Sequence, residues 1–111
     1  MLDYYHVMQI QRTEEFANWL HKLKDRQGRA RIFERLDRLA VGNPGITRSV
    51  GAGVMELKID FGPGYSVYYV RRGDLLILLL CGGDKSTQDK DIQRAKAMAN
   101  LAIEMEEEDG A

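Results

Sequence analysis

Cationic and hydroxyl side chains lie on both sides of a glycine–proline turn in this chain of 111 residues. Lys58 and Asp60 come just before the turn at residues 62–64, and Ser66 and Tyr68 come just after it. Because side chains alternate along a strand, Ser66 and Tyr68 are expected on one face of the strand that follows the turn. We therefore expect these side chains to converge on one region.

A second polar group, DKSTQDKD at residues 84–91, follows the most apolar stretch of the chain. The glycines at 82–83 would let the backbone turn sharply, which places Lys85 just before a helix begins. A helix N-terminus that offers Ser86, Thr87 and a lysine is a natural phosphate site. The residues alone leave an alternative open, in which Lys85 faces solvent and Ser86 only caps the helix.

Other kinds of site find little support in the sequence. The spacing of Ser, His, Asp and Cys residues fits no nucleophilic triad, and the glycines form neither a dinucleotide-binding fingerprint nor a P-loop. His6, His21 and Cys81 are too few and too scattered for a metal-ligand cluster. His21 is interpreted as a surface residue of a basic helix.

Charge is unevenly spread along the chain, whose net charge is −1. Five of the 17 acidic residues fall in 104–109, which leaves 12 acids against 16 basic residues elsewhere. Residues 22–38 alone hold seven basic and three acidic side chains. Such a patch can engage the phosphates of a nucleic acid, or it can be an ordinary solvated helix surface.

The hydrophobic pattern predicts an element order of β-α-α-β-β-β-α. A first strand is expected over 4–11, followed by a helix capped by Thr13 that ends near 26–28, and by a second helix that GNPG at 42–45 stops. Strands are then expected over 53–61, 65–72 and 75–81, with Gly82-Gly83-Asp84 ending the last. A final helix over about 86–106 would begin with a capping box of Ser86 and Asp89.

These elements predict a single α+β domain over 1–111, an antiparallel meander that carries helices, with an extension at 1–7 and an acidic tail at 104–111. No apolar run has the length of a membrane span, and the first residues lack the pattern of a signal peptide. A single cysteine fits a reducing cytoplasm. We therefore expect a cytoplasmic protein.

Four segments, in this order, carry a resemblance to a known family: RTEEFANWLHKLKD, RLDRLAVGNPG, GVMELKIDFGPGYSVYY and LLLCGGDKSTQDKDIQRAKAMA. Over roughly residues 8–103 the chain resembles the RelE/HigB-like toxins of type II toxin–antitoxin modules. Within that group it is most similar to the addiction module killer proteins, which are related to phage Gp49-like proteins.

The resemblance implies a RelE-like fold and a small ribonuclease that cleaves mRNA, usually in the ribosomal A site. A cognate antitoxin would silence it, typically a helix-turn-helix protein encoded by the adjacent gene. No cofactor or metal is expected, because RNA supplies its own nucleophile, the 2′-OH. The protein need only orient that group, move protons and stabilise charge on the phosphate.

Residue by residue, Lys58 matches the family's basic position in its E-L-[R/K] segment, and Lys85 matches the basic position after the central strand. Tyr65 and Tyr68 match the aromatic positions of its G-Y-R-V-Y segment, in which Ser66 replaces the arginine. The implied catalytic residues are Lys58, Lys85 and Tyr68. The candidate RNA-binding residues are Lys22, Lys24, Arg26, Arg29, Ser66 and Arg71.

Ser66 cannot supply the bidentate cationic fork of an arginine. The chain is therefore either an attenuated ribonuclease or a degenerate protein that keeps antitoxin binding or regulation. A ParE-like inhibitor of DNA gyrase is a further alternative, although the GGDKSTQ segment favours the ribonuclease. If Ser66 faces an open groove, Ser66→Arg should raise cleavage. If Ser66 is buried, or if Arg71 or Arg72 fills the role, arginine should add nothing or destabilise the hairpin.

Overall fold

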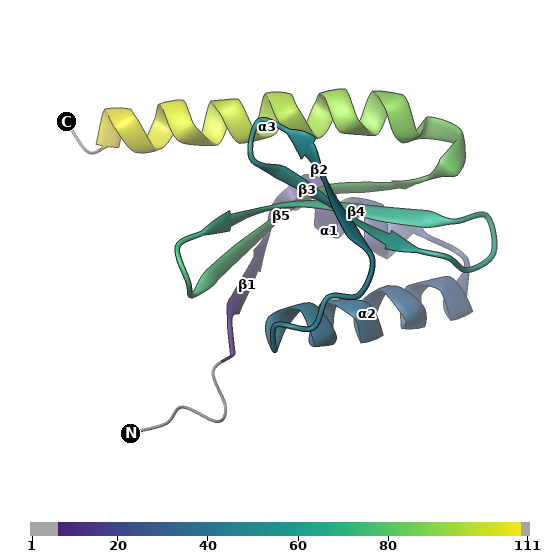
Figure 1. Cartoon of the computed structure of the whole chain (residues 1–111). Coiled ribbons are helices and arrows are strands. Elements are labelled where there is room, and N and C mark those ends of the chain that lie inside the picture. Colours follow the sequence, from purple (N-terminus) through teal and green to yellow (C-terminus); the bar gives the residue numbers. More distant parts are fainter. Residues whose placement is uncertain (1–6, 110–111) are drawn as a thin grey trace, which may run out of the picture.

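A computed structural model describes the backbone of residues 7–109 and the side chains of residues 7–102. Within these limits the chain forms five strands and three helices around one sheet (Figure 1). The strands are β1 (Gln9–Arg12), β2 (Thr47–Gly51), β3 (Val54–Ile59), β4 (Tyr65–Arg72) and β5 (Leu76–Asp84). The helices are α1 (Glu14–Lys22), α2 (Arg26–Ala40) and α3 (Gln88–Asp109), with a single 3₁₀ turn, η1 (Lys85–Thr87), before α3.

The sheet has the strand order β1-β5-β4-β3-β2 and confirms the α+β class. The predicted topology was wrong in two respects. The sheet is mixed, because β1 pairs in parallel with β5 while β2 to β5 form the antiparallel meander. It also contains β2, a strand at the sheet edge that was not expected, because its TRSVG sequence is mostly polar and carries almost no alternating apolar pattern.

Helices cover both faces of the sheet (Figure 1). Helices α1 and α2 bury Phe16, Leu20 and Ile32 against one face, which contributes Leu57, Val67 and others. Helix α3 buries small residues, Ala95 and Ala99, against the opposite face, where they meet the side chains of Val54, Tyr68 and Val70. Alternation along β4 therefore separates Ser66 and Tyr68 from Tyr65 and Val67, as predicted.

Helix α1 starts as predicted, because the Thr13 hydroxyl accepts a hydrogen bond from the amide of Phe16 at 3.0 Å. Its end near 26–28 was wrong, since α1 stops at Lys22 and α2 already begins at Arg26. The Asp25 carboxylate caps α2 by accepting from the amide of Gly28 at 2.9 Å. Gly28 therefore lies inside α2, where a Cβ would come within 2.7 Å of the Tyr65 ring.

The glycine pair at 82–83 was expected to end the central strand, but β5 continues through it to Asp84. A Cβ on Gly82 would collide with the indole of Trp19, and one on Gly83 would collide with the carboxylate of Asp91. These glycines thus let helices pack closely on both faces of the strand, and they do not form a turn.

The beginning of α3 also differs from the prediction. Asp84, and not Ser86, caps this region, because its carboxylate accepts from the amide of Ser86 at 2.8 Å, and among the described residues no hydrogen bond joins Ser86 to Asp89 as the expected capping box requires. The helix runs on to Asp109, so residues 104–109 of the predicted tail continue it. The expected first strand is shorter, from Gln9, and its residues 4–6 lie outside the described part, as do most of the extension at 1–7 and the last two residues. In the described part, no helix combines the length and hydropathy needed to cross a membrane.

Candidate functional site: a lysine cleft at the start of α3

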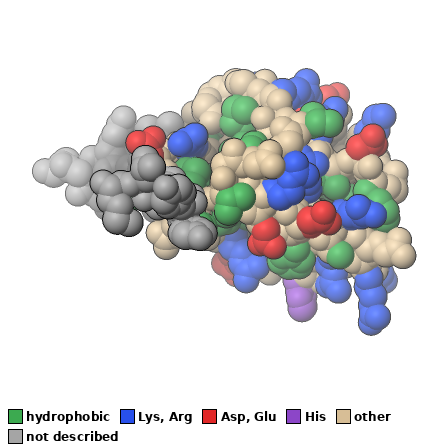
Figure 2. All heavy atoms as spheres, turned by 60° about the horizontal axis from the view of Figure 1, so that its bottom comes forward, with side chains coloured by type: hydrophobic (Ala, Val, Ile, Leu, Met, Phe, Trp, Pro, Cys, Tyr) green, Lys and Arg blue, Asp and Glu red, His purple; other side chains and the backbone are tan. Residues whose placement is uncertain are grey.

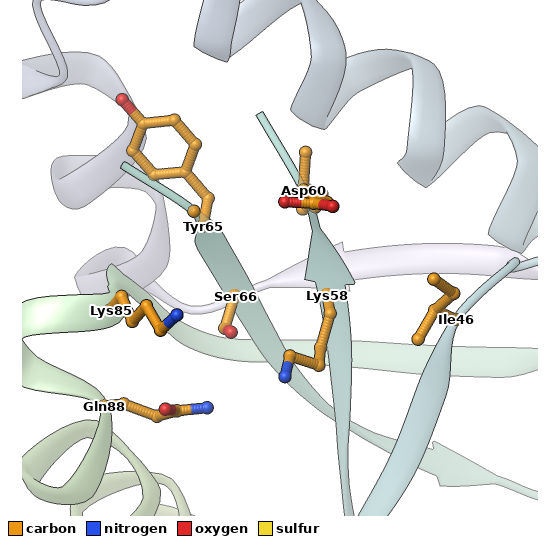
Figure 3. Close-up of a pocket in the computed structure, with 9 residues that line it drawn as sticks. Ile46, Lys58, Asp60, Tyr65, Ser66, Lys85 and Gln88 are labelled. Carbon is orange, nitrogen blue, oxygen red and sulfur yellow. The ribbon is translucent and has the colours of Figure 1, made fainter. Parts of the chain in front are cut away.

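A cleft of about 280 Å³ opens where β3 and β4 meet the start of α3. Lys58 from β3, Ser66 from β4 and Lys85 from η1 line it, together with Ile46, Ile59, Asp60, Gly64, Tyr65 and Gln88. In Figure 3 the amino groups of Lys58 and Lys85 and the amide of Gln88 extend toward the space in front of Ser66. The structure thus brings together three residues that the sequence placed in one site, from three separate elements.

The β-sheet register fixes the distance between Lys58 and Ser66, because the two residues are cross-strand partners on the face that α3 covers. The backbone of Lys58 is held from two further sides. Its amide donates to the carbonyl of Ile46 at 3.1 Å, and its carbonyl accepts from Nη1 of Arg35 at 2.8 Å. The lysine side chain itself is exposed. The ammonium group can therefore reach different parts of the cleft while the backbone of Lys58 stays in place.

Lys85 stands on the opposite wall of the cleft and is exposed as well. Its amide donates to the carbonyl of Gly64 at 3.0 Å, which ties η1 to the β3–β4 turn. Gly64 adopts φ 81°, a left-handed conformation that favours glycine. Among the residues that the structure describes, neither Lys58 nor Lys85 forms an ion pair. Two ammonium groups are therefore left to meet an anion in the cleft.

A buried carboxylate, that of Glu56, lies next to the cleft on the same face of β3. Its side chain is 0% exposed and accepts hydrogen bonds from three elements. Arg48 Nε on β2 donates at 2.6 Å, the Tyr68 hydroxyl on β4 at 2.8 Å, and Gln88 Nε2 on α3 at 2.9 Å. Burial alone would raise the pKa of Glu56, but these donors lower it to about 2. Glu56 is thus a fixed negative charge that orients its neighbours, and it is too weak a base to take up a proton near neutral pH.

The two tyrosines named from the sequence, Tyr65 and Tyr68, each donate a hydrogen bond from the hydroxyl to a carboxylate of the protein. Tyr68 is 0% exposed, and its hydroxyl is held by Glu56, so burial and this hydrogen bond raise its pKa. It does not line the cleft. Tyr65 lines the cleft, but its hydroxyl donates to Asp25 at 2.6 Å. Burial and that carboxylate raise the pKa of Tyr65 to about 12.

The remaining basic candidates lie away from the cleft. Lys22, Lys24, Arg26 and Arg29 belong to the α1–α2 hairpin, which covers the opposite face of the sheet. Figure 2 views the molecule with the side that is lowest in Figure 1 turned forward, and there the basic side chains alternate with acidic ones and form no single patch. His21 is exposed, as predicted.

Arg71 and Arg72 are at the far end of β4 from Ser66. The Arg71 guanidinium donates from Nε to the carbonyl of Gly73 at 3.0 Å and lies 3.7 Å from the carboxylate of Asp74. It therefore belongs to the β4–β5 turn. Neither arginine lines the cleft, so neither supplies the cation that Ser66 lacks.

Ser66 lines the cleft, as predicted, but only 6% of the residue is exposed. This position is less open than the groove that the Ser66→Arg prediction assumed. Sequence reasoning missed Gln88, Glu56 and Arg48. For Glu56 a signal was present, since an acidic residue alternates with Val54 on the inward face of a strand that pairs on both sides.

Comparison with known proteins found a relative of this chain. The chain is 51% identical over 93 residues to a protein of Haemophilus influenzae whose function is uncharacterised, and the match covers 84% of this chain and 94% of that protein. The two belong to one family. No family model matches the chain.

The chemistry open to this member of the family follows from its cleft. Two lysines, a serine hydroxyl and a glutamine amide face one small volume, and cations placed in this way can stabilise charge that develops on a bound phosphate. The tyrosine hydroxyls are occupied, and the buried glutamate is held as an anion. The arrangement suits binding and electrostatic stabilisation of a phosphate.

Proposed function

We propose that this protein is the toxin of a type II toxin–antitoxin module, of the RelE/HigB type. Its activity would be metal-independent, ribosome-dependent cleavage of mRNA. The observation that carries the proposal is the meeting of Lys58, Ser66 and Lys85 in one cleft. These are positions that the resemblance selects, and they come from elements separated in sequence.

In this proposal Lys58 and Lys85 hold the scissile phosphate from opposite walls of the cleft. The 2′-OH of the preceding ribose attacks the phosphorus and gives up its proton to water, and the bond to the 5′-oxygen of the next nucleotide breaks as that oxygen takes a proton from water, which leaves a 2′,3′-cyclic phosphate and a 5′-hydroxyl. The lysines stabilise the negative charge that builds up on the phosphate. The Ser66 hydroxyl and the Gln88 amide can hydrogen-bond the same group. Tyr68 has no role in contact with substrate, because its hydroxyl is buried against Glu56.

An antitoxin would inhibit such a protein by covering or distorting the cleft. We expect the helix-turn-helix protein encoded by an adjacent gene to form a tight complex with this chain, and to cover Lys58 and the basic α1–α2 hairpin. The test is co-expression and purification of the two proteins. Growth arrest by the chain alone, relieved by the partner, supports the proposal, and separate elution at micromolar concentration counts against it. We also expect the acidic segment 104–109 to stay largely solvated in this complex, and its side chains lie outside the described residues.

A second candidate is a degenerate toxin that keeps only antitoxin binding or regulation. The observation that favours it is the 6% exposure of Ser66, since this buried serine gives the cleft no third cation. Complex formation without growth arrest would identify this case. A gyrase inhibitor of the ParE type would instead cause gyrase-linked DNA breaks to accumulate.

A further inference from the structure

Arg48 is a cation near the cleft that the sequence did not single out. It lies on β2 as the cross-strand partner of Glu56, and the ion pair between Nε and the carboxylate has a length of 2.6 Å. The arginine side chain is 53% exposed, whereas the glutamate side chain is 0% exposed. One edge of the guanidinium is thus anchored to a buried charge while the rest faces solvent.

The terminal nitrogens of Arg48 have no partner in the part of the chain that the structure describes. Its guanidinium contacts Glu56 through Nε alone. An arginine fork with a fixed Nε and two unoccupied terminal nitrogens is preorganised to donate to an oxyanion. The contact with Glu56 also raises the pKa of Arg48, so the side chain is always charged.

The position of Arg48 extends the cleft in one direction. Lys58 is two residues beyond Glu56 on β3, so Arg48 and Lys58 are diagonal neighbours on one face of the sheet. Such neighbours are about 7–8 Å apart, within reach of long side chains. Gln88, which lines the cleft, shares the Glu56 carboxylate with Arg48. Arg48 therefore lies beyond Gln88 and outside the cleft that Lys58 and Lys85 line.

We infer that Arg48, held by Glu56, forms a second phosphate subsite, which binds the phosphate next to the one in the lysine cleft. This inference rests on the proposed function and narrows the substrate to a single-stranded polynucleotide with at least two adjacent phosphates. The subsite also gives the chain a guanidinium on the same sheet face as Ser66. Because Arg48 extends from β2, the buried position on β4 can hold a small residue, Ser66.

The test is to measure binding of two probes, inorganic phosphate and a short single-stranded RNA with 2′-O-methyl groups, which cannot be cleaved. Arg48→Gln should weaken binding of the RNA about tenfold, the effect of losing one charged hydrogen bond. The plot of log affinity against log salt, which has a negative slope, should also become less steep by about 0.7, because one phosphate contact is lost. Inorganic phosphate should bind more tightly between the two lysines of the cleft than at Arg48 alone, so its affinity for this variant should stay unchanged.

Arg94→Gln is the matched control. Arg94 also forms a 2.6 Å ion pair, with Glu15, and its side chain is 57% exposed. This variant should bind both probes as the parent does. A folded Arg48→Gln variant with the affinity and salt slope of the parent would overturn the inference.

If Arg48→Gln does not fold, Arg48→Lys decides, because lysine still compensates the charge of Glu56. Lysine lacks the planar fork that pairs with Glu56 through Nε while its terminal nitrogens face the phosphate, so weaker RNA binding is expected, and unchanged RNA binding overturns the subsite. Neither probe requires cleavage. A parent that shows Arg48-dependent RNA binding but cuts no mRNA would refute the ribonuclease and keep the subsite. A parent that cuts mRNA and binds RNA independently of Arg48 would refute the subsite alone.

Discussion

Replacing Glu56 by glutamine should remove a specific part of the acid sensitivity of this protein. The Glu56 carboxylate is buried and accepts hydrogen bonds from Arg48, Tyr68 and Gln88. These donors hold its pKa at about 2, against an ordinary value of 4.5. Because the pKa is lower in the folded than in the unfolded state, the stabilisation is complete above pH 4.5 and is lost as the pH falls toward 2.

The size of this effect follows from the two pKa values. At about 1.4 kcal/mol per pH unit, the difference between 4.5 and about 2 corresponds to about 3 kcal/mol. About 2 kcal/mol of it should already be lost at about pH 3. Glutamine at 56 does not titrate, so the variant lacks this part of the pH dependence.

The assay is urea unfolding of the parent and of Glu56→Gln at a series of pH values from neutral to about pH 3. We expect the free energy of unfolding of the parent to fall by about 2 kcal/mol relative to that of Glu56→Gln over this range. At neutral pH, Glu34→Gln, which changes an exposed glutamate of α2, should stay within about 0.5 kcal/mol of the parent. A parent–variant difference that stays constant with pH, or that grows in acid, would show that Glu56 is not the low-pKa anion described here.

Two further substitutions test the packing around the site. Gly82→Ala should lower the free energy of unfolding by about 1–3 kcal/mol, because its Cβ would collide with the Trp19 ring, and an unchanged urea midpoint would contradict that packing. Ser66→Arg should destabilise the protein by a similar amount, because the position is 6% exposed and a second guanidinium would compete with Arg48 for Glu56. In a folded Ser66→Arg variant, cleavage above the parent's would support the attenuation hypothesis, and equal or lower cleavage would reject it.

Local patterns predicted the parts of the fold that depend on neighbours in sequence. Strands β3 and β4 follow from their alternation and from the glycine–proline turn between them, and the start of α1 follows from the Thr13 cap. The meeting of Lys58 and Ser66 could be predicted for the same reason, since a tight turn fixes the register of the strands on either side of it.

Features that depend on partners distant in sequence could not be predicted. Whether a glycine pair makes a turn or admits a close neighbour is decided at residues 82–83 by Trp19 and Asp91, which lie on two different helices. Strand β2 is held by pairing with β3, and its own sequence is too polar to mark it. Glu56 is stable as a buried anion only because β2, β4 and α3 each bring one donor to it.

The most direct test of the proposed function is cleavage of mRNA on programmed ribosomes by the purified protein. The parent should cut the message, and Lys85→Ala should lower the rate by about 10², the scale of losing one donor that stabilises transition-state charge. Lys90→Ala removes an exposed lysine of α3 that does not line the cleft, and it should cut as the parent does. Both variants should unfold at the urea midpoint of the parent. A folded parent that leaves ribosome-bound mRNA intact, or a Lys85→Ala variant that cuts at the parental rate, would contradict the account.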